Sequence, residues 1–344
     1  MSTANLDSAD LKAVAKGGLI RSDVMNKIWD ISKVPLPFTD SIGTDSATNE
    51  YKEWTLDALA APDLTNARID GADASGNDTV TGSRVGNHHQ ISDKVVRVSF
   101  RADSSNTIGR TKELSYQVMR RQQELRRDVE AIALSNQASV ADDGNSTAGK
   151  AGGLPSWLVT NHATGGTPGG YNTTTGLTVA RTPTAARALT ETLVRDTVES
   201  IYNNGGDPTI MMSIPSVIRK FSEYLFTSSA RVATLMSDQG KTAEAATALG
   251  SVNVFVTDFG TLKLVPNRLQ QKHTDSGVIQ VADVFIYDPA YLAMCYLQGY
   301  RTEDLAKTGT ANNKQMLVDW TLVVNTEKAH GIIGDINPAS AVTA

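Results

Sequence analysis

The chain has 344 residues, of which 40% are apolar and 20% charged, so it can bury a core and is not disordered as a whole. Its formal net charge of −5 argues against a dedicated nucleic-acid-binding protein, because such proteins carry a basic excess or a basic stripe. No stretch approaches the roughly 18 consecutive apolar residues that a membrane-spanning helix needs. The N-terminus also lacks the basic start and apolar run of a secretory signal.

A single cysteine, Cys295, lies in the apolar run YLAMCYL. One cysteine cannot form a disulfide within the chain, and a buried free thiol fits a reducing cytoplasm. We therefore expect Cys295 to be packed in the core rather than to act as a nucleophile.

Residues 1–48 are mixed and polar, interrupted by Pro35 and Pro37, and they predict an extended arm that needs a partner surface. Two runs with period-two alternation follow, at 50–59 and 94–102, and they predict half-buried strands. About thirty residues rich in Gly, Asp, Asn, Ser and Thr separate the two runs, which is too long for a connection inside a compact domain. The sequence therefore predicts that the two strands form a projecting hairpin whose tip rests on another molecule.

The strongest helix signal covers 107–135. Some 27 residues at 1.5 Å each make a rod of about 40 Å, longer than an ordinary domain helix, so we expect a structural strut. Its polar face is heavily charged, and Arg126 and Glu130 stand one turn apart as a favourable pair. The apolar face consists of Leu114, Val118, Leu125, Val129 and Ile132.

The remainder mixes strands and helices in blocks, which predicts an α+β fold. After a Gly/Ser/Thr-rich region, a second helix is expected to begin with Thr182 as N-cap and Pro183 in its first position, and to end at 203–206. A third helix is expected at 215–226. Strands are expected at 209–213, 251–257, 261–266, 278–288 and 316–324.

Residues 142–152 read DDGNSTAGKAG, in which Gly144, Gly149 and Lys150 have the spacing of a phosphate-binding loop. A working loop of that kind follows a buried strand and opens a helix. Here it follows the predicted long helix and precedes AGGLPSW, which opposes a helix, and Ala151 stands where Ser or Thr would hold magnesium. We interpret the stretch as a flexible loop that reverses the chain.

No other pattern predicts chemistry. His88 and His89 are adjacent, so on a strand they point to opposite faces, and no metal-binding spacing accompanies them. Asp70, Asp73 and Asp78 resemble a calcium loop only loosely, because the spacing is wrong and the closing Glu is missing. The sequence therefore predicts no catalytic residue, no cofactor and no metal site, and the protein is not expected to be an enzyme.

Six stretches appear in a specific order over most of the chain from about 50 to 335: EYKEWTLDALAAP, NARIDGA, GRTKELSYQVMRRQQELRRDVEAIALSNQ, AGKAGGLPSWL, VTDFGTLKLVPNR and KQMLVDWTLVVNTEKAHGIIGDI. In these stretches and in its order of parts, the chain resembles the major capsid proteins of tailed bacteriophages, which have the Hong Kong 97-type fold. The sequences of these stretches most resemble those of the short-tailed phage branch.

The resemblance implies five parts: an N-terminal arm (1–48), an extended hairpin (49–103), a peripheral domain with the spine helix (104–180), an axial domain (181–285), and a return to the peripheral domain with a C-terminal strand (286–344). It implies that the arm and hairpin lie over neighbouring subunits and that the axial domain faces the centre of hexamers and pentamers. Many copies would form an icosahedral head, assembled in the bacterial host cytoplasm, that encloses double-stranded DNA without sequence-specific binding.

Some relatives cross-link their shells through a Lys–Asn bond from the hairpin. No lysine lies between Lys52 and Lys94, so we expect non-covalent contacts instead. We also expect a separate scaffolding protein with little or no N-terminal processing, a portal, and in some cases a cement protein. The candidate subunit-interface residues are Trp54, Asp70, Asp73, Asp78, Arg84, Arg120, Arg121 and Arg127.

Other interpretations stay open. An encapsulin-like compartment protein would share the shell architecture, and a tail or baseplate component would share similar strands. Closed particles of phage-head size favour a capsid protein, whereas small cargo-loaded shells favour an encapsulin.

Overall fold

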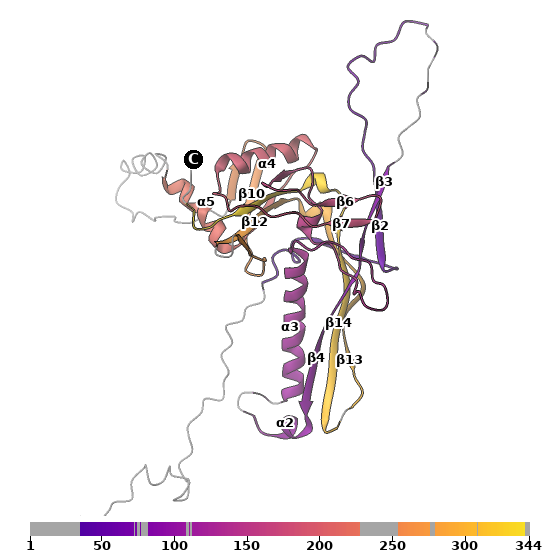
Figure 1. Ribbon diagram of the computed structural model, residues 1–344, viewed down its shortest axis with the longest axis vertical. Coiled ribbons are helices and arrows are strands. Elements are labelled where there is room, and N and C mark those ends of the chain that lie inside the picture. The colour runs from indigo at the N-terminus through magenta and orange to yellow at the C-terminus, as the bar shows by residue number, and fades with distance from the viewer. Residues whose placement is uncertain are drawn as a thin grey trace, which may run out of the picture.

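The structure is a computed structural model that describes residues 35–71, 73, 76, 82–107, 110, 112–227, 254–275, 279–307 and 309–340. A long helix and three long strands run side by side in its narrow part, below a broader part that holds the other two large helices (Figure 1). A two-stranded hairpin with a long loop projects from the side of the broad part (Figure 1).

The narrow part is a four-stranded sheet covered by the long helix. The sheet has the order β1 (Gly43–Ser46), β13 (Leu292–Asp304), β14 (Ala311–Val324) and β4 (Gln90–Ser99). Only β1 runs parallel to its neighbour. Helix α3 (Glu113–Ala133) packs on β4 and β14, and the short α2 (Phe100–Ser104) precedes it. The predicted apolar face of the strut is confirmed, since all five of its side chains join the core under this sheet.

The broad part is a seven-stranded mixed sheet with two helices packed into one core with it. Its path is β5 (His162–Ala163), β15 (Gly331–Ile336), β12 (Ile279–Tyr287), β8 (Ile210–Ser213), β10 (Gly260–Pro266) and β9 (Val254–Thr257), with β11 (His273–Asp275) paired to β12. Helices α4 (Glu191–Asn203) and α5 (Pro215–Thr227) contribute Val194, Ile201 and Val217 to that core. The predicted helix at 215–226 and the strands around 209–213, 261–266 and 278–288 are confirmed.

Two small hairpins complete the described fold: β2 (Tyr51–Leu56) with β3 (Ser83–His88), and β6 (Gly170–Asn172) with β7 (Leu177–Val179). Single 3₁₀ turns lie at Leu154–Ser156, Pro289–Tyr291 and Glu327–Ala329.

The expected pairing of 50–59 with 94–102 is wrong. Strand β2 pairs with β3, whereas 94–99 belongs to β4, which pairs with β14 in the sheet of the narrow part. Strand β3 escaped detection because Val85, Gly86 and Asn87 are buried in succession, so they show no alternation. The glycine is required there, since a Cβ at Gly86 would lie 2.6 Å from Cζ of Tyr51.

Helices α3 and α4 begin later than expected. Helix α3 starts at Glu113 and has 21 residues, which makes a rod of about 30 Å at 1.5 Å per residue. Helix α4 starts after Thr190, whose hydroxyl caps the amide of Leu193, and not after Thr182. The intervening segment is held extended by tertiary bonds that local propensity does not encode: the amide of Thr184 donates to the Asp335 carboxylate, and the amide of Arg187 donates to the carbonyl of the same residue.

The end of the arm does not need a partner surface. Leu36, Phe38 and Ile42 are buried in the chain's own core, and the ring of Phe38 meets Tyr287 edge-on at 5.7 Å. The expectation of an unsupported arm over 1–48 is therefore wrong for 35–46, and residues 1–34 lie outside the described part of the chain.

Glu130 fixes this arm end to the long helix. Its carboxylate is fully buried on α3 and accepts hydrogen bonds from the amides of Phe38 and Thr39, each at 2.8 Å. It also accepts from the Thr39 hydroxyl and, at 2.8 Å, from the side-chain amide of Asn267, which directly follows β10. The expected pair with Arg126 is wrong, because that guanidinium lies over the ring of Tyr300, 5.2 Å from its centroid.

Replacing Glu130 by Ala should lower the free energy of unfolding by about 3 kcal/mol or more, since several buried donors lose their only strong acceptor. Urea unfolding of unassembled subunits measures this loss. Glu124→Ala is the matched control on the same helix: it removes a partly exposed pair with Arg121 and should cost about 0–1 kcal/mol. Equal losses in the two variants would contradict the role of Glu130.

Candidate functional site

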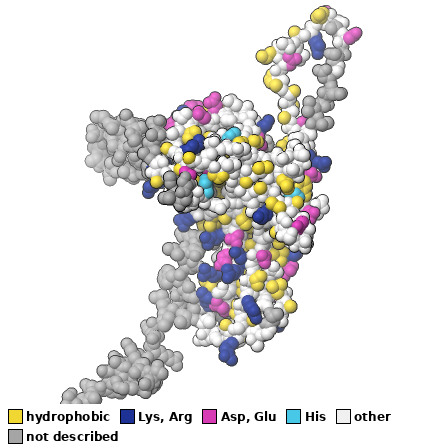
Figure 2. Space-filling view, in the orientation of Figure 1, with side chains coloured by type: hydrophobic (Ala, Val, Ile, Leu, Met, Phe, Trp, Pro, Cys, Tyr) yellow, Lys and Arg dark blue, Asp and Glu magenta, His cyan; other side chains and the backbone are white. Residues whose placement is uncertain are grey.

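The loop between β2 and β3 has the most exposed apolar side chains in the described part of the chain. Leu59, Leu64 and Ile69 are 100%, 97% and 82% exposed. The loop stands clear of the molecule, and its hydrophobic atoms form an open row along the loop (Figures 1 and 2). Such side chains are stabilised only when another surface covers them, so this loop is the first candidate for a subunit contact.

The structure separates the charged residues expected at the tip. Asp70 and Asp73 are exposed in the loop, and Asp78 lies outside the described residues. Arg84 is not at the tip: it lies in β3, at the base of the hairpin, with Nη1 3.5 Å from Oε2 of Glu53 on β2. The loop therefore carries Asp70 and Asp73 beside a single basic residue, Arg68, and its charge is predominantly acidic.

Trp54 is occupied within its own chain. Its ring is half-buried and lies 5.4 Å from the ring of Trp157, which in turn stacks on Tyr171 at 5.7 Å with nearly parallel planes. Trp54 thus anchors the base of the hairpin to the core, and it offers only part of its surface to a neighbour.

The three candidate arginines lie along α3. Arg121 is paired with Glu124, and Arg120 reaches toward the ring of Tyr116, with 6.0 Å to its centroid. Arg127 is half-buried, and its Nε has no hydrogen-bond partner among the described residues. Figure 2 shows Lys and Arg side chains gathered over this part of the molecule, with Asp and Glu side chains among them.

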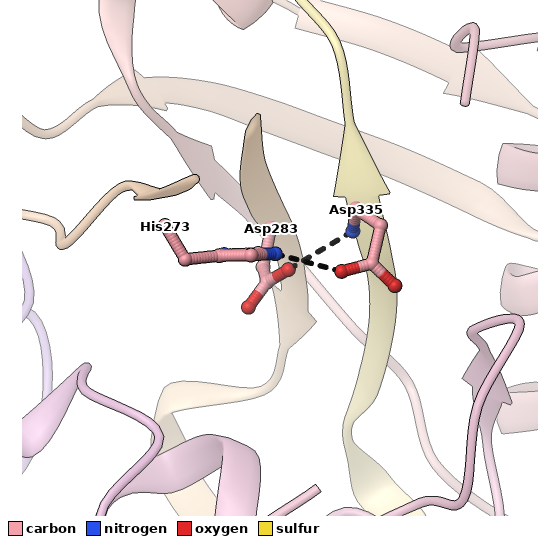
Figure 3. A group of neighbouring side chains, drawn as sticks. All are labelled: His273, Asp283 and Asp335. Atoms are coloured by element: carbon pink, nitrogen blue, oxygen red, sulfur yellow. Dashed lines mark hydrogen bonds and ion pairs between the residues drawn. The ribbon is translucent and has the colours of Figure 1, made fainter. Parts of the chain in front are cut away.

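A buried polar cluster joins three strands of the seven-stranded sheet to the segment before α4 (Figure 3). The Nε2 atom of His273 is 2.8 Å from Oδ1 of Asp335, and the Asp335 amide donates to Oδ1 of Asp283 at 3.1 Å. The guanidinium of Arg181 bonds both carboxylates, with Nη2 2.5 Å from Asp283 and 3.2 Å from Asp335. Asp335 also has a left-handed backbone, with φ of 62°.

The donor atoms of His273, Asp283 and Asp335 lie close enough together to hold a metal ion, within 4.8 Å of one another. However, the Arg181 guanidinium already supplies a positive charge to both carboxylates. Burial alone would raise the pKa of Asp335, but hydrogen bonds from His273 and Arg181 hold it well below its usual range. The geometry therefore fits an ion-pair cluster that fixes the sheet better than it fits a metal centre.

The stretch that spells a phosphate-binding loop is a hydrogen-bonded turn. Val140 and Lys150 pair across it, and the Asp143 carboxylate accepts from the amides of three following residues. Gly144 supplies the left-handed position, with φ of 67°. The chain continues into the 3₁₀ turn at 154–156 and not into a helix, so no helix N-terminus faces the turn.

Cys295 is fully buried on β13, and burial raises the pKa of its thiol. Among the described residues, no helix combines the length and apolarity needed to cross a membrane.

A family model described as SU10 major capsid protein matches residues 3–337. The chain belongs to the SU10 major capsid protein family. The major capsid protein of Escherichia phage Phieco32 is 37% identical over 113 residues, which is 33% of this chain and 32% of that protein. The matched region therefore spans about a third of the length of this curated relative.

Solved capsid structures share the fold of this capsid-family chain. The asymmetric unit of the cyanophage A-1(L) capsid has a TM-score of 0.61 at 12% identity and covers 94% of this chain and 99% of its own. The capsid of a native GTA particle has a TM-score of 0.60 at 12% identity, and the match covers 96% of this chain and 99% of that chain. The holo-SrpI encapsulin complex from Synechococcus elongatus has a TM-score of 0.54 at 10% identity, and the match covers 96% of this chain and 98% of that chain. The Hong Kong 97-type fold is thus confirmed, and family membership makes the protein a structural virion component rather than an enzyme.

Asp335→Asn should destabilise the capsid subunit at pH 7, because the buried Arg181 guanidinium loses one of its two anionic partners and keeps only Asp283. A carboxylate whose folded pKa is lowered contributes stability above its ordinary pKa, about 3.9, and that stability is lost as pH falls through the folded value. The difference in urea midpoint between wild type and variant should therefore shrink below about pH 4. Asp70→Asn, an exposed loop change, should alter stability by less than about 0.5 kcal/mol at either pH. A wild-type–variant difference that is constant from pH 7 to pH 3 would contradict this account.

Proposed function

We propose that many copies of this chain assemble as hexamers and pentamers into the icosahedral head of a phage, which encloses double-stranded DNA without sequence-specific binding. The observation that carries the proposal is the β2–β3 loop, whose Leu59, Leu64 and Ile69 are 82–100% exposed although the body has its own buried cores. A loop of this kind gains stability when a second copy covers it.

The parts of the subunit would divide this work. We assign the arm to 1–48, of which 35–46 pack on the chain's own body, the hairpin to 49–103, the peripheral domain to 104–180 and 286–344, and the axial domain, facing the centre of each capsomer, to 181–285. Strand β4 lies within 49–103 but belongs to the four-stranded sheet. The projecting element itself therefore consists of β2, β3 and their loop.

Charge favours a contact between the loop of one copy and helix α3 of another. Residues 57–82 contain five aspartates and one basic residue, Arg68, with no lysine. Helix α3 carries Arg120, Arg121 and Arg127, all partly exposed, together with Glu124 and Asp128, which are paired with Arg121 and Lys94. Single exposed pairs are worth about 0–1 kcal/mol, but a shell repeats them at every interface.

The remaining partners follow from the same proposal. We expect a portal, a scaffolding protein encoded separately, in some cases a cement protein, and assembly in the host cytoplasm. The net charge of −5 suits a wall that holds DNA weakly enough for packaging and ejection.

An encapsulin-like compartment is the second candidate, because a solved encapsulin shares the fold over 96% of this chain. Purified particles separate the two: DNA-filled heads support the capsid, whereas small shells around a protein cargo support the compartment.

A charge exchange tests the proposed contact in expressed particles viewed by negative-stain electron microscopy. Reversal of the loop (D63K, D70K and D73K together) or of the helix (R120E with R127E) should each reduce the yield of closed shells at least several-fold, through like-charge repulsion. Both sets in one chain should restore much of the yield.

Asp196→Lys on the exposed side of α4 is the matched control and should assemble normally. If wild-type protein stays monomeric at high concentration, the proposed function fails. If wild-type shells form but the exchanged charges do not rescue one another, only the loop–α3 contact fails.

Purified shells should dissociate completely into single chains on a denaturing gel, because the loop between Lys52 and Lys94 lacks the lysine that a Lys–Asn bond requires. A ladder of covalent multimers in particles prepared without cross-linker would contradict this expectation. Boiling with reductant excludes disulfides through Cys295 as the source of any ladder.

A further inference from the structure

A buried histidine sits where the hairpin joins the body. His89 is the single residue between β3, which belongs to the two-stranded hairpin, and β4, which belongs to the four-stranded sheet. Its side chain is only 3% exposed, and its Nδ1 is 3.3 Å from Oδ1 of Asp319 on β14, which is 10% exposed. The two sheets are joined by the chain here and at 47–50, between β1 and β2, so a change in the angle between them moves the backbone at His89.

The pair is incompletely satisfied. Both ring nitrogens of His89 lack a hydrogen-bond partner with good geometry among the described residues. The same is true of Oδ1 of Asp319. Buried polar atoms nearly always find partners, so their absence at a junction between two sheets calls for a physical explanation. The surrounding joint is otherwise well bonded: the amide of His89 donates to the carbonyl of Glu50, and the buried Asn87 side chain donates to the carbonyl of Leu322.

We propose that His89 and Asp319 form a proton-sensitive joint, which holds the hairpin against the four-stranded sheet while His89 is neutral and loosens when His89 is protonated. The inference concerns a single chain, so it does not depend on the proposed shell.

Burial and the neighbouring charges determine the direction in which the pKa of His89 is shifted. Burial lowers the pKa of His89, and the positive charge of Lys52 on β2 and the neighbouring His88 lower it further, against the opposing pull of Asp319. Burial likewise raises the pKa of Asp319, opposed by His89 and Arg301. Protonated His89 is thus disfavoured in the closed joint relative to an opened one in which water reaches the ring.

A group whose folded pKa is depressed stabilises the closed form above its ordinary pKa, about 6.5 for histidine. That contribution declines as pH falls from about 6.5 and is gone below the folded value. Opening of the joint should therefore increase by up to about tenfold per pH unit across this window, since one proton is taken up.

Hydrogen exchange of the full-length, unassembled chain tests the joint. Peptides that span 83–90, corrected for the intrinsic pH dependence of exchange, should open more readily from pH 7.5 to pH 5 in wild type. His89→Gln should abolish that pH dependence, whereas His162→Gln, at an exposed position, should leave it unchanged. His88→Gln should keep most of it.

An NMR titration of the His89 ring supplies a second readout that a purely structural role would not move. The ring should titrate below the usual histidine value in wild type and lower still in Asp319→Asn, because the neighbouring anion favours the protonated ring. The proposal is overturned if His89 titrates at or above about pH 6.5, if Asp319→Asn leaves its pKa unchanged, or if His89→Gln opens with the wild-type pH dependence.

Discussion

The fold depends on one buried carboxylate. Glu130 lies on the long helix where it meets the arm end and the seven-stranded sheet, and its carboxylate accepts hydrogen bonds from the arm end and from Asn267, directly after β10. A buried carboxylate is costly unless its oxygens are fully bonded, so the site is stable only when Phe38–Thr39, α3 and Asn267 stand in one arrangement. This constraint fixes the narrow and broad parts of the subunit relative to each other. A second cluster, around Arg181 and Asp335, fixes the segment before α4 to the same sheet.

Because the body is fixed in this way, the hairpin is the element that can contact neighbouring subunits. Its base is anchored by Trp54 and Asn87, while its loop holds aliphatic and acidic side chains away from the body. The division suits a shell subunit, in which identical bodies are arranged at small differences in angle and the projecting elements bridge them. Such a subunit does not require an enzyme's active-site pocket. The loop whose sequence resembles a nucleotide-binding loop forms a turn that the Asp143 carboxylate closes by hydrogen bonds.

The sequence predicted features that rest on local periodicity. The strut, the apolar alternation of β14 and helix α5 follow directly from spacing, and the lysine-free acidic loop is visible as composition. The misses share a tertiary cause. Strand β3 shows no alternation because it is buried on consecutive residues, and α4 starts late because Asp335 bonds the segment that precedes it. Strand β15 was not predicted, since its six buried residues lack a polar face.

Of the candidate interface residues, the loop aspartates could be found from sequence because exposed acidic loops need no tertiary context. Trp54 and Arg84 could not be placed correctly, since their neighbours Trp157 and Glu53 depend on which strands pair. The residues that matter most for the body, Glu130 and Asn267, look like ordinary surface residues in the sequence. Only their long-range partners, contributed by distant segments, reveal their role.

A cryo-electron microscopy structure of the assembled particle would show the arm end and the loop together. Every copy should keep Glu130 bonded to Phe38 and Thr39, while the loop at 57–82 lies on a neighbouring copy with Leu59, Leu64 and Ile69 covered. A loop folded back on its own subunit, or an arm end detached from Glu130 in the assembled state, would contradict this arrangement.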